Sequence, residues 1–397
     1  MRPRLEIAAL GVSQIIGYGT LYYSFSLLAP SMAQGFGWPM EWLYGALSLA
    51  LLSGGLVAPF VGRAIDRCGA ARLMAVGSVA AALTLVAGAL APSGPVFALA
   101  LIAMEMASTL VQYGAAFPLL SQRHGAGAQR SIVYLTLIAG FASTLFWPLT
   151  VWLEHALDWR QVYLLFALGH LLIALPIHLW LARPSRAIAG EEGAPAGVAR
   201  PLARGRLPEA WRRQGFVLMA LAFALQSFVS SAVLVHMVPM LGGLGIGTLA
   251  VLAGTLFGPA QVASRLVNMM LGRDLPQFAL AMISAGLLPA SLLLLVTTAP
   301  SFIGAVAFAL LFGMGNGLYS IVGGTLPLEL FGAAGFGARQ GEVTAIRLIV
   351  GAAAPFAFAV MMEVMGTVFA IVITSLIGSG AVLALFAIGR LTRSRPA

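Results

Sequence analysis

Charged residues are scarce in this chain, and lysine is absent. Only 9% of the 397 residues are charged, and all 22 residues counted as lysine or arginine are arginine. A soluble globular chain has roughly 25% charged residues, so water is not the main solvent of this one. The arginines lie in gaps between apolar blocks and form no basic face, so we expect no nucleic-acid partner despite the net charge of +9.

Cysteine is nearly absent as well. Cys68 is the single cysteine, so no disulfide within the chain can hold the fold together. The sequence has no cluster of His, Asp or Cys residues with metal-site spacing, and no nucleophile placed beside a base. We therefore expect neither an enzyme nor a bound metal or cofactor.

Apolar residues dominate what is present. They make up 60% of the chain, the mean hydropathy is +0.96, and the N-terminal segment has no obvious signal-peptide cleavage site. They come in blocks of about 20 residues, the length that a helix needs to cross the bilayer core. The sequence predicts an all-α integral membrane protein with twelve transmembrane helices at 8–34, 42–62, 72–92, 95–119, 129–153, 160–182, 215–241, 246–270, 276–297, 302–328, 338–362 and 367–390.

The arginines mark one side of the membrane. If both termini are cytoplasmic, 19 of the 22 lie in cytoplasmic segments, Arg160 lies in an outer loop, and Arg265 and Arg347 lie within spans. Cytoplasmic loops of membrane proteins carry an excess of positive residues, so this distribution fixes the orientation. We expect a multi-pass protein of the bacterial inner membrane with both termini in the cytoplasm.

The chain divides into two halves that repeat one another. The polar interval 183–214 is expected to be a cytoplasmic linker between six-helix bundles at 1–182 and 215–397. Parallel repeats of this kind predict a pseudo-symmetric pair of bundles with a substrate site between them near midplane. The residues that recur about 209 positions apart are Pro30 and Pro239, Gly62–Arg63 and Gly272–Arg273, Pro118 and Pro327, Arg130 and Arg339, and Pro148 and Pro355.

The gap between the second and third spans holds a glycine-flanked charged loop, Gly-Arg-Ala-Ile-Asp-Arg-Cys-Gly-Ala-Ala-Arg at 62–72. It resembles the signature loop of the major facilitator superfamily, Gly-x-x-x-Asp-Arg-x-Gly-x-x-Arg. The span number, duplication, linker and the Asp158-Trp159-Arg160-x-x-Tyr163 entry to the sixth span extend the resemblance over the whole chain. It implies a monomeric transporter that moves a small-molecule substrate by alternating access.

The resemblance also implies a gating role for this loop. In that family the loop carboxylate caps a helix of the other half and favours the outward-open state. Asp66 would do so here, at the start of the eleventh span near 338–342. Arg67 and Arg72 would pair with nearby carboxylates, of which Glu342 is a candidate. Gly62 and Gly69 complete the conformational gating set.

The eighth span resembles the monocarboxylate transporter branch of the superfamily. That branch carries Asp-x-x-x-Arg in this span, and this sequence has Gln261-Val-Ala-Ser-Arg265. The arginine matches the branch. An uncharged Gln261 stands where the branch has a protonatable aspartate, so the proton route of the branch does not carry over directly.

Polar side chains recur at helical spacing within several apolar spans. Such stripes are expected to line the interior, and the first, fourth, seventh and tenth spans line the cavity in the resembled family. Two arginines against one glutamate favour an anionic, carboxylate-like ligand held by guanidinium groups. The expected substrate-binding residues are Arg265, Arg347, Gln14, Tyr18, Tyr22, Gln226, Gln261 and Asn316.

Glu105 lies near the middle of the fourth span and is the candidate for proton coupling. A charged side chain at the bilayer centre costs about 2.5–3.5 kcal/mol, so a carboxyl there needs a proton, a partner or a wet cavity. The histidines of the sixth span, His170 and His178, are expected at the lipid-facing periphery of the family fold, with a packing role.

The sequence is compatible with three functions. The first is a secondary active or facilitative transporter of a small organic anion. The second is an efflux pump for amphipathic or cationic compounds, with Glu105 as its cation site. The third is a membrane sensor or receptor without transport, although the linker and tails are too short for a soluble signalling domain.

Overall fold

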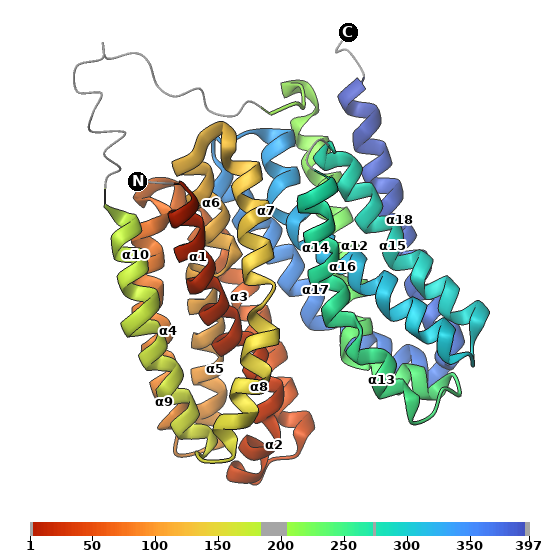
Figure 1. The fold of residues 1–397 in the computed structure, drawn as a ribbon, viewed down its shortest axis with the longest axis horizontal. Helices are drawn as coiled ribbons and strands as arrows, with labels where there is room; N and C mark the ends of the chain where they lie inside the picture. The colour runs from red at the N-terminus through yellow and green to blue at the C-terminus, as the bar shows by residue number, and fades with distance from the viewer. Residues whose placement is uncertain (1–2, 184–204, 273–274, 394–397) are drawn as a thin grey trace. The chain divides into compact units, whose positions relative to one another are not determined.

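A computed structural model describes residues 3–183, 205–272 and 275–393, and this part of the chain is helical with no β-strand (Figure 1). Residues 184–204 of the expected linker lie outside the described residues. The same holds for six arginines assigned to the cytoplasmic side: Arg2, Arg186, Arg200, Arg204, Arg273 and Arg395.

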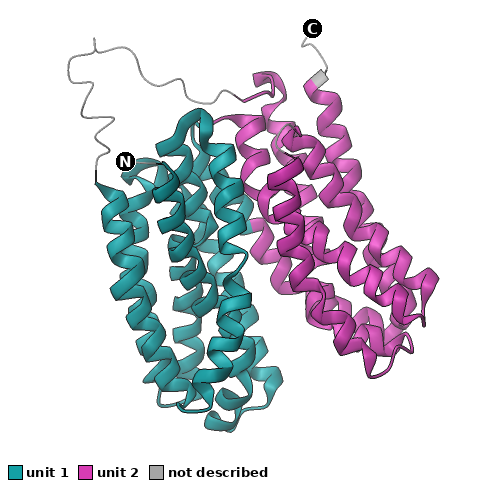
Figure 2. Cartoon of the chain, in the orientation of Figure 1, with its two compact units in different colours: residues 1–204, 333–345 teal, residues 205–332, 346–397 magenta. Residues whose placement is uncertain are grey.

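The helices form two compact units, which Figure 2 colours separately. Unit 1 consists of residues 1–204 and 333–345, and unit 2 of residues 205–332 and 346–397. Helix α17 (Phe336–Met365) therefore begins in unit 1 and ends in unit 2. The domain boundaries expected at residues 182 and 215 stay a prediction.

Unit 1 contains the N-terminal helices and two π-helical turns. They are α1 (Pro3–Tyr18), η1 (Gly19–Tyr23), α2 (Ser24–Phe36), α3 (Met40–Cys68), α4 (Ala70–Ala89), α5 (Gly94–Val111), α6 (Tyr113–His124), η2 (Gly125–Gly127), α7 (Ala128–Ala139), α8 (Ala142–Glu154), α9 (Trp159–Gly169), η3 (His170–Ala174) and α10 (Leu175–Ala182). Its core includes the buried side chains of Leu43, Phe97 and Tyr163.

Unit 2 contains the C-terminal helices. They are η4 (Glu209–Trp211), α12 (Arg212–Gly243), α13 (Leu249–Thr255), α14 (Phe257–Leu271), α15 (Gln277–Thr298), α16 (Phe302–Phe331), the later part of α17, and α18 (Thr367–Arg393). Val233, Leu292 and Phe312 lie in its buried core.

Ten helical stretches in the described chain are long and apolar enough to cross a membrane, judged by length and composition. One of them, Gly94–Glu154, has 61 residues and covers the two spans predicted at 95–119 and 129–153. Such a stretch would be about 90 Å long as one straight helix, far more than one crossing needs. The first predicted span corresponds to α1, η1 and α2, which are not among the ten.

The helix ends follow from local residue chemistry. Gly69 ends α3 with a φ of 88°, a left-handed conformation that glycine adopts without a steric cost. Asp158 precedes α9 as its N-cap. Its carboxylate accepts a hydrogen bond from the Gln161 N–H at 2.8 Å, and the Asp158 N–H donates one to Oε1 of Gln161.

Helices α14 and α16 approach each other closely because glycines line the contact. A Cβ atom at Gly313 would lie 2.6 Å from the carbonyl oxygen of Phe257 and 2.8 Å from Cβ of Ala260. Small residues let helices in membranes pack at short range, which replaces the missing hydrophobic driving force. This contact fixes α14, and with it Arg265, against α16.

We expect Gly313→Val to destabilise unit 2 by about 1–3 kcal/mol, since the added atoms overpack the α14–α16 contact. Thermal unfolding of the purified protein in detergent measures the effect. Gly286→Val on α15 is the control, because a Cβ at Gly286 meets no atom within 4 Å. Equal melting temperatures for the two variants would contradict the packing argument.

Candidate functional site

Arg265 lies on α14 and points at α16. Its Nε donates to the carbonyl oxygen of Gly317 at 3.3 Å, and an Nη atom donates to Oε1 of Gln261 at 3.2 Å. The side chain is only 6% exposed. Both of these acceptors are neutral oxygens, and they orient the guanidinium group of Arg265.

Arg347 reaches the same turn of α16 from another helix. Its guanidinium lies over the ring of Tyr319, 4.5 Å from the ring centroid. Gly323 leaves the space that this side chain occupies, since a Cβ there would lie 2.9 Å from an Arg347 Nη atom. Within unit 2, both arginines therefore contact α16 at the level of the turn 317–319, Arg265 on the side that faces α14 and Arg347 at Tyr319.

Tyr319 connects this turn to α12. Its hydroxyl donates to the carbonyl oxygen of Phe223 at 2.9 Å. A second contact, between the rings of Phe216 and Phe331, shows that α12 and α16 run antiparallel, because the α12 partner falls in number as the α16 partner rises. Gln226 and Asn316, each three residues from the Phe223–Tyr319 contact, therefore lie at one level.

Several polar atoms at this level have no hydrogen-bond partner in the described chain. They are both amide atoms of Gln226, Nδ2 of Asn316 and Oγ of Ser230, one turn further along α12. Gln226 is 1% exposed. Buried polar groups in proteins are nearly always paired, so this group calls for a ligand or bound water.

In unit 1, Gln14 supplies a hydrogen bond that is missing where the helix of the fourth span is interrupted. The chain leaves helical geometry at Gln112, between α5 and α6, and the amide N–H of Ala115 bonds back to Gln112. That leaves the carbonyl of Val111 without its helical partner, and Gln14 Nε2 donates to it at 2.6 Å. Gln14 thus acts first on the backbone, although its Oε1 has no partner in the described chain.

The two expected tyrosines lie differently. Tyr18 is half-buried with its ring 4.8 Å from that of Tyr113, next to the break in the fourth span. Tyr22 is 49% exposed and packs edge-on against Tyr23. Within unit 1 the structure brings Tyr18, and not Tyr22, to the broken helix.

Glu105 is buried in α5 at 4% exposure. Its carboxylate accepts a hydrogen bond from the Ser108 hydroxyl at 3.1 Å, and the described residues place no cation in an ion pair with it. Gly54 on α3 allows a close approach, since a Cβ there would lie 3.1 Å from the Glu105 carbonyl oxygen.

Asp66 contacts the first turn of α17 within unit 1. Its two carboxylate oxygens accept hydrogen bonds from the N–H groups of Gly337 at 2.9 Å and Ala338 at 2.8 Å. These N–H groups have no partner inside the helix, and the helix dipole favours a negative charge there. Gly62 brings the helices together, because a Cβ at that position would collide with the carbonyl oxygen of Gly337.

The expected pairing of the loop arginines with Glu342 is not formed. Arg67 and Arg72 are exposed, and the ion pairs of the described residues are Glu6–Arg123, Glu6–His124 and Glu329–Arg206. Glu342 lies about two turns after the start of α17. The carboxylate that contacts the first turn of this helix is that of Asp66.

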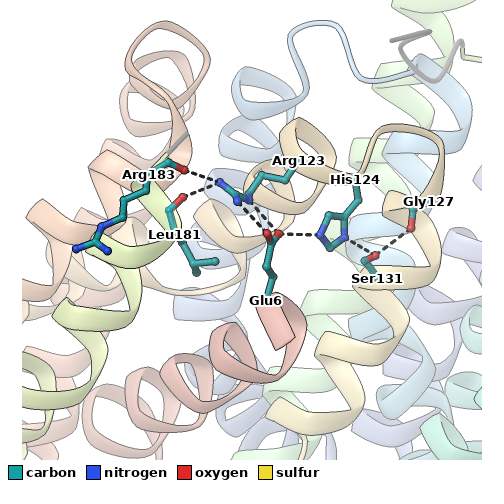
Figure 3. Close-up of polar contacts among 7 residues, drawn as sticks. All are labelled: Glu6, Arg123, His124, Gly127, Ser131, Leu181 and Arg183. Carbon is teal, nitrogen blue, oxygen red and sulfur yellow. Dashed lines mark hydrogen bonds and ion pairs between the residues drawn. The ribbon is translucent and has the colours of Figure 1, made fainter. Parts of the chain in front are cut away.

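A polar cluster that the sequence analysis missed ties α1 to α6 and α10 (Figure 3). Arg123 forms two hydrogen bonds with the Glu6 carboxylate, at 2.9 and 3.0 Å, and a third with the carbonyl oxygen of Leu181 at 2.7 Å. His124 bridges Glu6 and Ser131. The one available signal was Glu6, an acidic residue directly before the first apolar block.

This cluster favours the ionised form of the Glu6 carboxyl group, which lies before the first predicted span. Burial alone would raise the pKa of the Glu6 carboxyl, but the hydrogen bonds and charges of Arg123 and His124 outweigh burial and hold the pKa below its usual value. The bidentate geometry with Arg123 is the strong form of such a pair.

The packing role expected for the histidines of the sixth span is confirmed, but their side chains face the interior of unit 1 and not its periphery. His170 is 0% and His178 1% exposed. Nε2 of His170 lies 2.9 Å from the Thr20 hydroxyl, and the His178 ring joins Ser13 at 3.0 Å to Ser78 at 2.7 Å. The two π-helical turns, η1 and η3, carry Thr20 and His170, so irregular backbone turns both side chains inward.

Comparison with known proteins identifies the family. Residues 10–346 match the family model of the Major Facilitator Superfamily, so the chain belongs to that superfamily. No curated protein sequence is close enough to count as a match.

Solved structures share the fold. The human organic anion transporter MFSD10 (TETRAN) has a TM-score of 0.75 at 15% identity, covering 97% of this chain and 100% of its own. The proton:xylose symporter XylE has a TM-score of 0.74 at 14% identity over 96% and 95%. The fucose:proton symporter FucP of E. coli has a TM-score of 0.70 at 13% identity over the full length of both chains.

The predicted fold class is thereby confirmed: an all-α multi-pass membrane protein with the major facilitator fold. Membership indicates a transporter of a small molecule and not an enzyme. The assignment to the monocarboxylate-like branch stays a prediction.

We expect the stabilisation by the Glu6 cluster to depend on pH. Because the folded-state pKa of Glu6 lies below its unfolded value, the contribution is complete above the unfolded pKa, about 4.3 for glutamate, and is lost as the pH falls through the folded pKa. Melting temperatures of wild type and Glu6→Gln should differ at pH 7 and converge in acid. Glu41→Gln, an exposed site, is the control; a difference that persists unchanged in acid would contradict this.

Proposed function

We propose that this transporter moves a small organic anion of the carboxylate class across the membrane by alternating access. The observation that carries the proposal is that Arg265 and Arg347 contact α16 at the same level, within one turn of each other. Two cations near the middle of apolar helices are costly, and a ligand with a negative charge offsets that cost.

The chemistry around the arginines favours a carboxylate. A guanidinium offers planar, paired N–H donors that match the two oxygens of a carboxylate. The neighbour of Arg265 is the neutral Gln261, which orients the guanidinium without neutralising its charge. Arg347 lies over the electron-rich face of Tyr319, and the described residues give it no ion pair.

Gating would use the loop at Asp66. Its two hydrogen bonds to the start of α17 hold one end of that helix to unit 1, and Gly62 makes the short approach possible. A conformational change that separates these elements must break both charge-assisted hydrogen bonds, so they bias the equilibrium toward the state in which they form. Gly69 ends α3 sharply and so keeps Asp66 in place.

Proton coupling would use Glu105. A carboxylate in an apolar interior is costly without a cation, and binding a proton removes the cost. Ser108 donates to the ionised form and can accept from the protonated form, so both states have a partner.

The anion proposal predicts that Arg265→Ala lowers substrate affinity by about 10- to 100-fold, the value of a lost charge-assisted hydrogen bond. Arg265→Lys should recover only part of the loss, because the ammonium group keeps the charge and lacks the paired donors. Uptake of organic anions into liposomes measures both. Arg130→Ala is the control, an exposed arginine that contacts Tyr134. Unchanged saturation kinetics in both Arg265 variants would remove this residue from the site.

The coupling proposal predicts that Glu105→Gln abolishes uptake driven by a pH gradient and retains exchange of substrate against substrate, which needs no net proton movement. Counterflow and gradient-driven uptake are measured in the same liposomes. Glu154→Gln is a matched control, since the Glu154 carboxylate also accepts from a serine hydroxyl, that of Ser31 at 2.9 Å. Gradient-driven uptake that survives in Glu105→Gln rules this residue out.

A further inference from the structure

The unpaired atoms beside the arginines include acceptors as well as donors. Nε2 of Gln226 and Nδ2 of Asn316 are donors, Oε1 of Gln226 is an acceptor, and the Ser230 hydroxyl is both. A plain carboxylate only accepts hydrogen bonds. It could satisfy the two amide nitrogens and would leave Oε1 of Gln226 unpaired.

A hydroxyl group supplies what the carboxylate lacks. It donates one hydrogen bond and accepts others, so it can satisfy both atoms of the Gln226 amide at once. The Ser230 hydroxyl lies one turn further along α12 and can donate to, or accept from, a second hydroxyl group. The described atoms therefore suit a ligand with two or more hydroxyl groups.

The spacing along α12 supports an extended ligand. Gln226 lies one turn from the Phe223–Tyr319 contact that carries Arg347, and Ser230 lies about 6 Å further along the helix axis. A carboxylate held at the arginines would thus have its hydroxyl-bearing carbons beside Gln226, Asn316 and then Ser230.

We propose that the substrate is a polyhydroxylated carboxylate, such as a sugar acid or a short hydroxy acid with two or more hydroxyl groups. The inference rests on the proposed anion transport and specifies the part of the substrate that the arginines do not contact. The atoms concerned are covered in the present conformation, and the opening movement of alternating access would expose them to the ligand.

Matched ligand sets test this on the full-length protein in detergent, with binding followed by the rise in melting temperature and by titration calorimetry. The polyhydroxy acids are gluconate and glycerate, the acids without hydroxyls are hexanoate and propionate, and the uncharged polyols are sorbitol and glycerol. We expect at least one polyhydroxy acid to bind about 100-fold or more tightly than its hydroxyl-free counterpart, since unpaired polar groups of a site reject such analogues.

The outcomes distinguish the hydroxyl requirement from anion transport itself. Equal binding of a polyhydroxy acid and its hydroxyl-free counterpart would overturn the hydroxyl requirement and leave anion transport standing. Binding of the uncharged polyols with no binding of any acid would overturn the anion proposal itself. Absence of binding by both gluconate and glycerate would also overturn the inference.

Variants then show which residues distinguish the hydroxylated acids from their hydroxyl-free counterparts. Gln226→Leu should reduce the preference for the hydroxylated acid about tenfold, because it removes two hydrogen-bonding atoms, and Ser230→Ala should reduce it less. Ser291→Ala is the control, a buried serine whose hydroxyl already donates to the Leu288 carbonyl at 2.7 Å. An unchanged preference in Gln226→Leu would contradict the assignment; if that variant fails to fold, Ser230→Ala and the wild-type ligand sets decide the question.

Discussion

The structure depends on one constraint: in a bilayer, a polar group must find its partner inside the protein. Few residues in the chain are charged, so the contacts of each charged residue within the helices are informative. Arg265 uses a main-chain carbonyl and an amide, Arg347 an aromatic face, and Glu105 a hydroxyl. Each of these contacts orients the side chain.

The two units differ in where their unpaired polar atoms lie. Unit 1 joins its helices with polar pairs, such as Glu6 with Arg123 and His178 with two serines, and its unpaired atoms, among them Oε1 of Gln14 and Nδ1 of His170, are on residues spread over several helices. Unit 2 leaves a group of amide and hydroxyl atoms unpaired beside its arginines. Hydrogen-bonded polar groups contribute to stability, whereas unpaired buried groups cost free energy. The group of unpaired atoms in unit 2 is therefore the better indication of a functional site.

The helices, the superfamily and the position of Arg265 could be predicted from the sequence, because they depend on amino-acid composition and on the spacing of apolar and polar residues. Apolar blocks predict the helices, and the loop at 62–72 predicts the superfamily that the comparison then identified. The position of Arg265 on a polar stripe follows from helical spacing alone. These features are local, and a single sequence records local information directly.

The remainder depends on which helices meet, and spacing along one helix does not contain that information. The inward placement of His170 needs an irregular turn, and the Glu6 cluster joins residues 117 positions apart. The pairing of Glu342 with the loop arginines failed for the same reason, since sequence proximity to a helix start does not fix the direction of a side chain. Tyr319, which receives Arg347, had no sequence signal beyond being an aromatic residue.

The contact between Gln14 and the carbonyl of Val111 has a mechanical consequence. In the fourth span, the main-chain N–H that would normally donate to the Val111 carbonyl is replaced by the side-chain amide of Gln14. The hydrogen bonding of the fourth span therefore includes a donor from the first span. If the fourth span were to straighten into a regular helix, its own N–H would compete for that oxygen and expel the amide. The shape of one span is thus set by the position of another, and the two can change only together.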